Sequence, residues 1–161
     1  MTINDYNFCV SHHADHLFRF ILKHTQHEEN ARDVVQNAFE ILWQKCDEVD
    51  VEKAKSFLFS VAYKNMIDQF RKQKKVSLVD EFSAQTKIVN EHKSGLKETL
   101  EKALNKLPEV QKSCVLLRDY EGYDYKEIGE ILSLNESQVK VYIFRARQTL
   151  KNYLVSIETV L

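Results

Sequence analysis

The chain is poor in residues that interrupt helices, since its 161 residues include only three glycines and one proline. Together with 43% apolar residues, this scarcity predicts a helical globular protein and argues against a β-rich or disordered chain. No apolar run approaches the roughly 18 residues of a membrane span. The polar N-terminus also lacks the apolar core of a signal peptide. We therefore expect a soluble, cytoplasmic chain without stable membrane insertion.

Cysteines and catalytic motifs are also sparse. Cys9, Cys46 and Cys114 are odd in number and far apart, which favours free thiols in a reducing cytoplasm over disulfides or a zinc knuckle. Cys9, His13 and His16 have a spacing that could place metal ligands on one helix face. That face lies about 100° from the apolar stripe of the same helix, on a flank that is more often solvated. The chain has no glycine-rich phosphate loop or nucleophile elbow, so we expect no metal, no cofactor and no catalysis.

Positive charge is not in excess overall, because the formal net charge is −1. It is concentrated locally instead. Residues 57–75 hold five Lys or Arg and one acid, and residues 137–156 hold four Lys or Arg and no acid. Two basic segments on a nearly neutral chain suit a protein that contacts DNA without binding every duplex tightly.

Apolar periodicity predicts an all-α fold made of two small helical domains, residues 1–75 and 96–161. A flexible linker at residues 76–95 would join them, because this stretch loses the periodicity and is too long for an ordinary loop. Within the first domain we expect helices over about 5–25, 28–45 and 51–75. The buried stripe predicted for the first helix is Val10, Ala14, Leu17, Phe18 and Ile21.

Residues 124–150 carry the clearest local pattern, a short helix, a tight turn and a second, basic helix. Asp124 with Glu127, and Asn135 with Gln138, have the spacing of reciprocal N-terminal caps. The stripe predicted to be buried in the second helix is Val139, Ile143, Ala146 and Leu150. A basic helix presented in this way is suited to a DNA major groove, whereas the alternative is an ordinary charged surface helix.

Four ordered segments resemble one family. They are Asp33–Trp43, Phe57–Lys72, Leu104–Pro108 and the helix-turn-helix with Glu127–Leu132 and Val139–Arg147. Together they resemble bacterial RNA polymerase sigma factors, and the two-domain layout resembles the extracytoplasmic-function group. The resemblance implies a chain that binds core RNA polymerase, recognises promoter DNA and helps to open it. It also implies control by an anti-sigma factor, which in this family is frequently membrane-bound.

The resemblance assigns polymerase binding to one face of the second helix. Its residues are Asp33, Gln36, Asn37 and Glu40. A negative, hydrogen-bonding strip suits a basic partner groove, whereas the alternative is a solvated helix face. Asn37 stands where the family usually has Glu, which weakens the charge there but keeps a hydrogen-bond acceptor.

DNA binding is assigned to both basic segments. The residues expected to contact DNA are Lys64, Asn65, Arg71, Lys72, Ser137, Gln138, Lys140, Val141, Tyr142, Arg145 and Arg147. The first four would face the minus-ten element and the others the minus-thirty-five element. We expect most of the nearby aromatics, Phe57, Phe59, Tyr63 and Phe70, to belong to the core.

Several residues depart from the family pattern. Val141 and Tyr142 stand where polar residues or Arg are common, Ser133 where the turn often has Gly, and Gly129 where Ala is usual. The promoter sequence therefore cannot be read from this chain.

Two other interpretations remain open at this stage: a stand-alone helix-turn-helix regulator, and a metal protein or enzyme built on the histidine-rich first helix.

Overall fold

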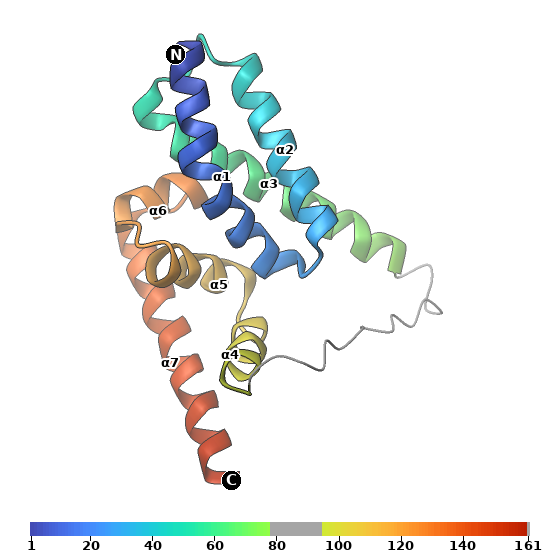
Figure 1. The fold of residues 1–161 in the computed structure, drawn as a ribbon. Helices are drawn as coiled ribbons and strands as arrows, with labels where there is room; N and C mark the ends of the chain where they lie inside the picture. The colour runs from blue at the N-terminus through green and yellow to red at the C-terminus, as the bar shows by residue number, and fades with distance from the viewer. Residues whose placement is uncertain (78–94, 161) are drawn as a thin grey trace.

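The computed structural model describes residues 1–77 and 95–160. Among these residues every regular element is a helix, which confirms the all-α prediction. Most of the linker predicted at 76–95 lies outside the described residues. Figure 1 shows the N-terminal helices in the upper part of the molecule and the C-terminal helices below, with the two termini at opposite ends.

The N-terminal half contains three long helices and one short turn. They are α1 (Ile3–Thr25), α2 (Glu28–Gln44), the 3₁₀ turn η1 (Val51–Lys53) and α3 (Ala54–Ser77). Thr2 caps α1 through a reciprocal pair of hydrogen bonds with Asp5. Since α1 and α2 each pack on the other and on α3, the three form a compact bundle.

The buried face of α1 is wider than the predicted stripe. Of that stripe, Leu17 and Ile21 are buried and Ala14 and Phe18 are partly buried, whereas Val10 is 36% exposed. Cys9, Phe20 and His24 are buried in addition. The reason is that α1 packs on the C-terminal half as well as on α2 and α3, so a second side of the helix is covered. A single amphipathic stripe cannot describe a helix that contacts several neighbours.

The C-terminal half contains four α-helices and a π-helical turn. They are α4 (Gly95–Asn105), α5 (Glu109–Val115), the π turn η2 (Leu116–Tyr120), α6 (Tyr125–Leu132) and α7 (Glu136–Val160). Gly122 follows η2 with φ of 74°, a backbone conformation that favours glycine. The chain thereby turns from η2 into α6.

The helix-turn-helix is formed by α6 and α7. Asn135 and Gln138 each accept a hydrogen bond from the other's backbone N–H, at 2.8 and 3.0 Å, which confirms the predicted cap of α7. Asp124 caps α6 by accepting from the Glu127 N–H at 2.7 Å. The reciprocal half of that cap was predicted wrongly, because the Glu127 carboxylate instead accepts from Lys55 of α3 at 2.9 Å.

The two halves pack against each other rather than only being linked in sequence. The helix α6 lies on the first part of α3, and buried side chains of both halves belong to one continuous hydrophobic core. Phe59 of α3 meets Tyr123 edge-to-face, with ring centroids 5.3 Å apart. Periodicity within separate segments gives no information about such a contact.

Candidate polymerase and nucleic-acid interfaces

The outer face of α2 holds the residues expected to bind polymerase. Asp33, Gln36 and Glu40 are exposed, opposite the buried side of the helix. The Gln36 Nε2 donates a hydrogen bond to Glu40 Oε1 at 3.4 Å. Asn37 is half-buried and its Oδ1 accepts from Asn65 Nδ2 at 2.9 Å. Asn37 therefore joins α2 to α3, while the other three side chains form the accessible acidic strip.

Trp43, near the end of α2, closes the Asp33–Trp43 segment of the resemblance but is not among the residues predicted to bind polymerase. It is 50% exposed, and its ring packs edge-on to Tyr6 at 5.0 Å between centroids. The Tyr6 hydroxyl donates to the Phe39 carbonyl of α2 at 3.2 Å. A half-exposed indole fixed in this way extends the acidic strip with an apolar group, a combination that is common in protein interfaces.

The exposed face of α3 brings together several of the expected DNA contacts. Lys64, Arg71 and Lys72 are exposed. A shallow cavity of about 370 Å³ is lined by Tyr63, Lys64, Ile67, Asp68 and Arg71. Asn65 is partly buried and is held between Asn37 and Gln69 by hydrogen bonds.

The aromatics of α3 face mainly inward. Phe59 is buried, and Phe57, Tyr63 and Phe70 are partly buried against the hydrophobic core. This confirms the prediction that most of them are core residues. The accessible chemistry of α3 is therefore cationic, and Tyr63 contributes one aromatic edge to the cavity.

The first turns of α7 form the other expected DNA-binding face. A second shallow cavity, of about 260 Å³, is lined by Asn135, Ser137, Gln138, Val141, Tyr142 and Arg145. Val139, Ile143 and Ala146 are buried on the opposite side, as the sequence predicts. Five of the residues expected to contact DNA thus share one surface, and Asn135 joins them although it was first noticed only as a cap.

Arg147 has a different environment from Arg145. Its Nε and Nη2 donate to the two carboxylate oxygens of Asp119 at 3.1 and 2.5 Å. The hydrogen bond with Asp119 raises the pKa of Arg147. The Asp119 carboxylate, which lies on η2, thus orients the Arg147 guanidinium through two hydrogen bonds. Arg147 is therefore not simply free to contact a phosphate. The two partners are 28 residues apart, so no local pattern indicates this pair.

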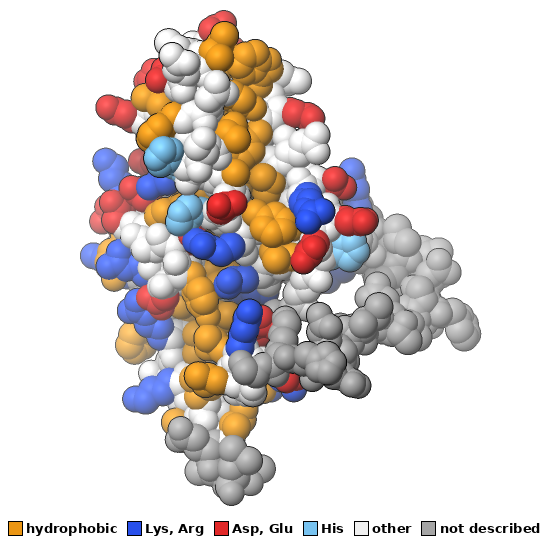
Figure 2. All heavy atoms as spheres, in the orientation of Figure 1, with side chains coloured by type: hydrophobic (Ala, Val, Ile, Leu, Met, Phe, Trp, Pro, Cys, Tyr) orange, Lys and Arg blue, Asp and Glu red, His pale blue; other side chains and the backbone are white. Residues whose placement is uncertain are grey.

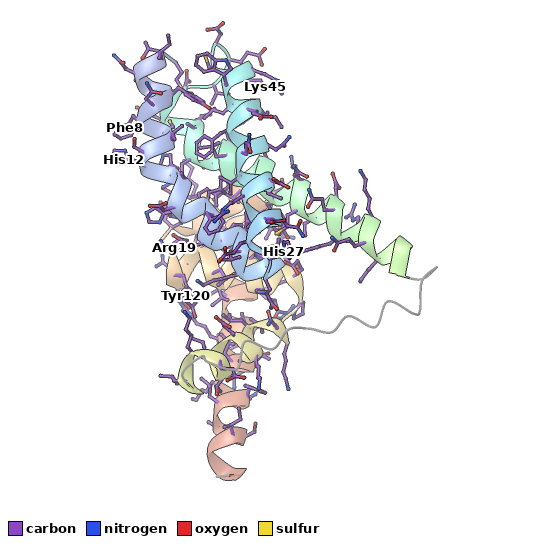
Figure 3. All side chains as sticks on the ribbon, turned by 45° about the vertical axis from the view of Figure 1, so that its right-hand side comes forward. Phe8, His12, Arg19, His27, Lys45 and Tyr120 are labelled. Atoms are coloured by element: carbon purple, nitrogen blue, oxygen red, sulfur yellow. The ribbon has the colours of Figure 1, made fainter. Side chains whose placement is uncertain are left out.

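The histidine-rich first helix does not form the suspected ligand cluster. Cys9 is buried, and His16 contacts Glu121 of the C-terminal half at 2.7 Å. Phe8 and His12 stack with ring centroids 3.7 Å apart and project from α1 on the side away from α2 (Figure 3). Within residues 1–77 and 95–160, no three His, Cys, Asp or Glu side chains are grouped as a metal site would require.

The surface of the described part of the chain carries charges of both signs. On the face drawn in Figure 2, Lys and Arg side chains are interspersed with Asp and Glu. The charge on this face is therefore mixed and not uniformly cationic. None of the described helices is long and apolar enough to cross a bilayer.

Comparison with known proteins identifies the family to which this chain belongs. The Sigma-70 region 2 model matches residues 9–76, and the Sigma-70, region 4 model matches residues 97–150. The ECF RNA polymerase sigma factor SigM of Bacillus subtilis (strain 168) is 31% identical over 140 residues, covering 84% of this chain and 86% of that protein. The chain belongs to the extracytoplasmic-function sigma factors.

This sigma factor therefore directs promoter-specific transcription initiation. It is also 26% identical over 144 residues to the RNA polymerase sigma factor SigV of Bacillus subtilis (strain 168), covering 89% of this chain and 87% of that protein. Its fold is similar to that of the sigma factor RpoE in complex with the anti-sigma factor NepR from Bartonella quintana. That match has a TM-score of 0.80 and 22% identity, covering 94% of this chain and 98% of that chain.

Proposed function

We propose that this sigma factor binds core RNA polymerase through the outer face of α2, and that α3 and α7 then contact the two elements of a promoter. The observation that carries the proposal is the separation of chemistry along the chain. An acidic strip lies on α2, whereas exposed cations lie on α3 and α7. Each surface suits a different partner: a basic protein groove for the first and nucleic acid for the others.

On α2, Asp33 and Glu40 supply carboxylates and Gln36 supplies an amide between them. Such a strip attracts a basic groove and fixes its register through hydrogen bonds. Asn37 acts indirectly in this proposal, because its side chain holds α3 through Asn65. A hydrogen bond thus connects the helix that faces polymerase with the helix that faces DNA.

On α7, the surface lined by Ser137, Gln138, Val141, Tyr142 and Arg145, which we call the reading face, would enter the major groove of the minus-thirty-five element. Arg145 can donate two hydrogen bonds to a guanine, and Lys140 can donate to a guanine or a phosphate. Val141 offers an apolar surface that fits a thymine methyl group. Ser137, Gln138 and Tyr142 add hydroxyl and amide groups along the same cavity.

On α3, Lys64, Arg71 and Lys72 would contact phosphates near the minus-ten element. Opening a duplex requires cations for the backbone and a surface for an unstacked base. The cavity beside Tyr63 and Ile67 provides an apolar surface next to Lys64 and Arg71. Asn65 is also proposed to contact DNA, and to do so its amide would exchange its hydrogen bonds with Asn37 and Gln69.

We infer that the chain performs no catalysis of its own and acts in the cytoplasm, where bacterial RNA polymerase works. An anti-sigma factor is the proposed regulatory partner. Two solved structures with this fold are described as complexes, RpoE with NepR and CnrH with the cytosolic domain of CnrY. The partner of this chain would cover surfaces needed for polymerase or promoter binding.

The proposed function is tested by transcription of a genomic promoter library with core RNA polymerase, with and without the purified protein. We expect a set of new start sites that share an upstream element and appear only when the protein is present. Unchanged initiation at every template would refute the proposal.

A further inference from the structure

Phe144 is an aromatic residue on the exposed side of α7 that the proposed function does not use. Its side chain is 70% exposed, more than any other Phe, Tyr or Trp side chain in the described part of the chain. A single exposed apolar side chain is ordinary in a folded protein. Phe144, however, has an apolar neighbour on the same face of the helix, so it forms part of a larger apolar surface.

That neighbour is Val141, which is 44% exposed. Side chains three positions apart on a helix are neighbours, with Cβ atoms about 5–6 Å apart. We call Val141 and Phe144 together the apolar ridge. The exposed residues Ser137, Val141, Phe144 and Gln148 follow one another at intervals of four, three and four residues. They therefore form one line along α7, on the side opposite the buried stripe that contains Val139 and Ile143.

The surroundings of the apolar ridge are cationic. Lys140 and Arg145 are both exposed, and the helical period places them on the two sides of the line that contains the ridge. No acidic residue occurs between positions 137 and 156. An apolar surface between cations, without a carboxylate, suits a polyanion better than a neutral or basic protein surface. The occupant favoured by this chemistry is duplex DNA.

Only one group in the major groove matches an apolar ridge. Each base edge there presents hydrogen-bond donors and acceptors, and thymine alone adds an apolar C5-methyl group. A phenyl ring over the N4 amine of cytosine would leave that donor without a partner, which is unfavourable. Successive bases are about 3.4 Å apart along the helix axis. The two side chains of the ridge are spaced closely enough to contact methyl groups on neighbouring base pairs.

We propose that the apolar ridge reads two neighbouring thymines of the minus-thirty-five element through their C5-methyl groups, and that Phe144 is a specificity-determining residue. The inference rests on the proposed function. Val141 stands where polar residues or Arg are common in the family, so methyl contact here replaces a polar contact. Arg145, next to the ridge, should read a guanine beside the thymines.

The test uses the protein bound to core polymerase and a promoter recovered from the genomic library. The minus-thirty-five element of that promoter is randomised, and the duplexes are prepared either with thymine or with deoxyuridine, which lacks only the C5-methyl group. Selection from the thymine form should yield elements with two neighbouring thymines beside a guanine. In the deoxyuridine form the preference at those two positions should disappear, whereas the guanine should remain selected.

Affinity is then measured for the selected element with one methyl group removed at a time. Each removal should weaken binding of the parent protein with core about fourfold, as expected for one buried methyl group. In Phe144→Ser the removal should have no effect at one of the two positions, and in Val141→Ser at the other. Both side chains are exposed, so neither substitution should lower the melting temperature.

Val155→Ser is the matched control. Val155 is also exposed, at 49%, but lies about three turns beyond Phe144 on the same helix. This variant should discriminate between thymine and deoxyuridine as the parent does.

Equal affinity of the parent for the two forms of the element would overturn the inference, whatever the variants do. A Phe144→Ser variant that loses core association but keeps the preference for the methyl groups would also overturn it, because Phe144 would then belong to a protein interface. The proposed function would survive either result if transcription from the recovered promoter still required the protein. Failure to recover any promoter would instead reject the proposed function, and the inference with it.

Discussion

Gly129 shows how a neighbouring backbone can exclude a side chain from one position. A Cβ atom placed at this residue would lie 2.5 Å from the Leu134 carbonyl oxygen, which is closer than such atoms approach in proteins. The turn is tight because Ser133 adopts a left-handed conformation with φ of 59° and the Leu134 N–H bonds to the Gly129 carbonyl at 2.9 Å. The two departures from the family pattern, Gly129 and Ser133, are thus parts of one local geometry.

We predict that Gly129→Ala destabilises the protein by about 1–3 kcal/mol, because the backbone oxygen of Leu134 must move. Thermal unfolding followed by circular dichroism measures the change. Gly95→Ala is the matched control, since nothing lies within 4 Å of a Cβ atom there and no loss of stability is expected. Equal melting temperatures for Gly129→Ala and the parent would contradict the described turn.

The thiols should differ sharply in reactivity. Burial raises the pKa of Cys114 to about 12, whereas Cys46 is partly exposed. Alkylation of native protein at pH 8 should modify Cys46 first and leave Cys114 intact until the protein unfolds. Mass spectrometry of the alkylated peptides measures this order of labelling, and equal labelling of both thiols would refute it.

The burial of Cys114 should also make folding stability depend on pH. Above pH 9 the thiol of the unfolded protein ionises while that of the folded protein stays protonated, so Cys114 should lower the free energy of unfolding as pH rises.

At the scale of elements, the reading face of α7 separates two arginines that look equivalent in sequence. Arg145 lines the cavity on that face, whereas Arg147 is engaged by Asp119. We predict that Arg145→Ala weakens use of a cognate promoter by roughly 1–3 kcal/mol, as for a lost bidentate base contact. Core binding should not change. Promoter-dependent transcription measures the effect, and Arg147→Ala should mainly lower thermal stability.

A separate prediction concerns the outer face of α2. Replacing Asp33 and Gln36 together by Ala should reduce affinity for core polymerase without unfolding the bundle, because both side chains are exposed. Glu28→Ala is a suitable control on the same helix, since Glu28 pairs only loosely with Arg32 at 3.8 Å. Undiminished core affinity of the double variant would return this face to an ordinary solvated surface.

The elements that the sequence predicts best are those with local causes. The cap formed by Asn135 and Gln138 and the buried stripe of α7 depend on residues three or four positions apart, and both are present. The second half of the Asp124 cap fails because Glu127 finds a distant cation in Lys55. Non-local pairs of this kind leave no periodic signal.

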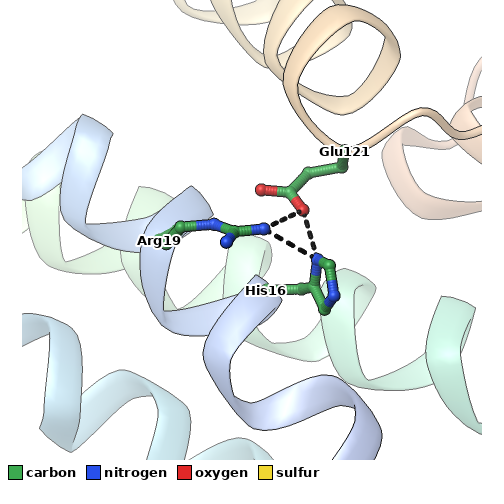
Figure 4. A network of polar contacts seen from close by, with 3 residues as sticks. All are labelled: His16, Arg19 and Glu121. Carbon is green, nitrogen blue, oxygen red and sulfur yellow. Dashed lines mark hydrogen bonds and ion pairs between the residues drawn. The ribbon is translucent and has the colours of Figure 1, made fainter.

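At the scale of the whole molecule, the sequence predicted two helical units but not the surface between them. The enclosed Glu121 and the half-buried face of α1 become intelligible only when both halves are seen together. The spacing of Cys9, His13 and His16 suggests metal ligands on one helix face, whereas His16 contacts Glu121, which lies 105 residues away in the sequence (Figure 4). The candidate DNA-binding residues were accessible to sequence reasoning because their motifs are contiguous.

The central claim is that this chain recognises promoters as a subunit of RNA polymerase. The most direct test is the fluorescence anisotropy of a labelled cognate promoter, titrated with the protein alone and then with core polymerase. We predict weak binding by the protein alone and tight, sequence-specific binding when core is added. Tight and specific binding without core would contradict the account and would identify a stand-alone helix-turn-helix regulator.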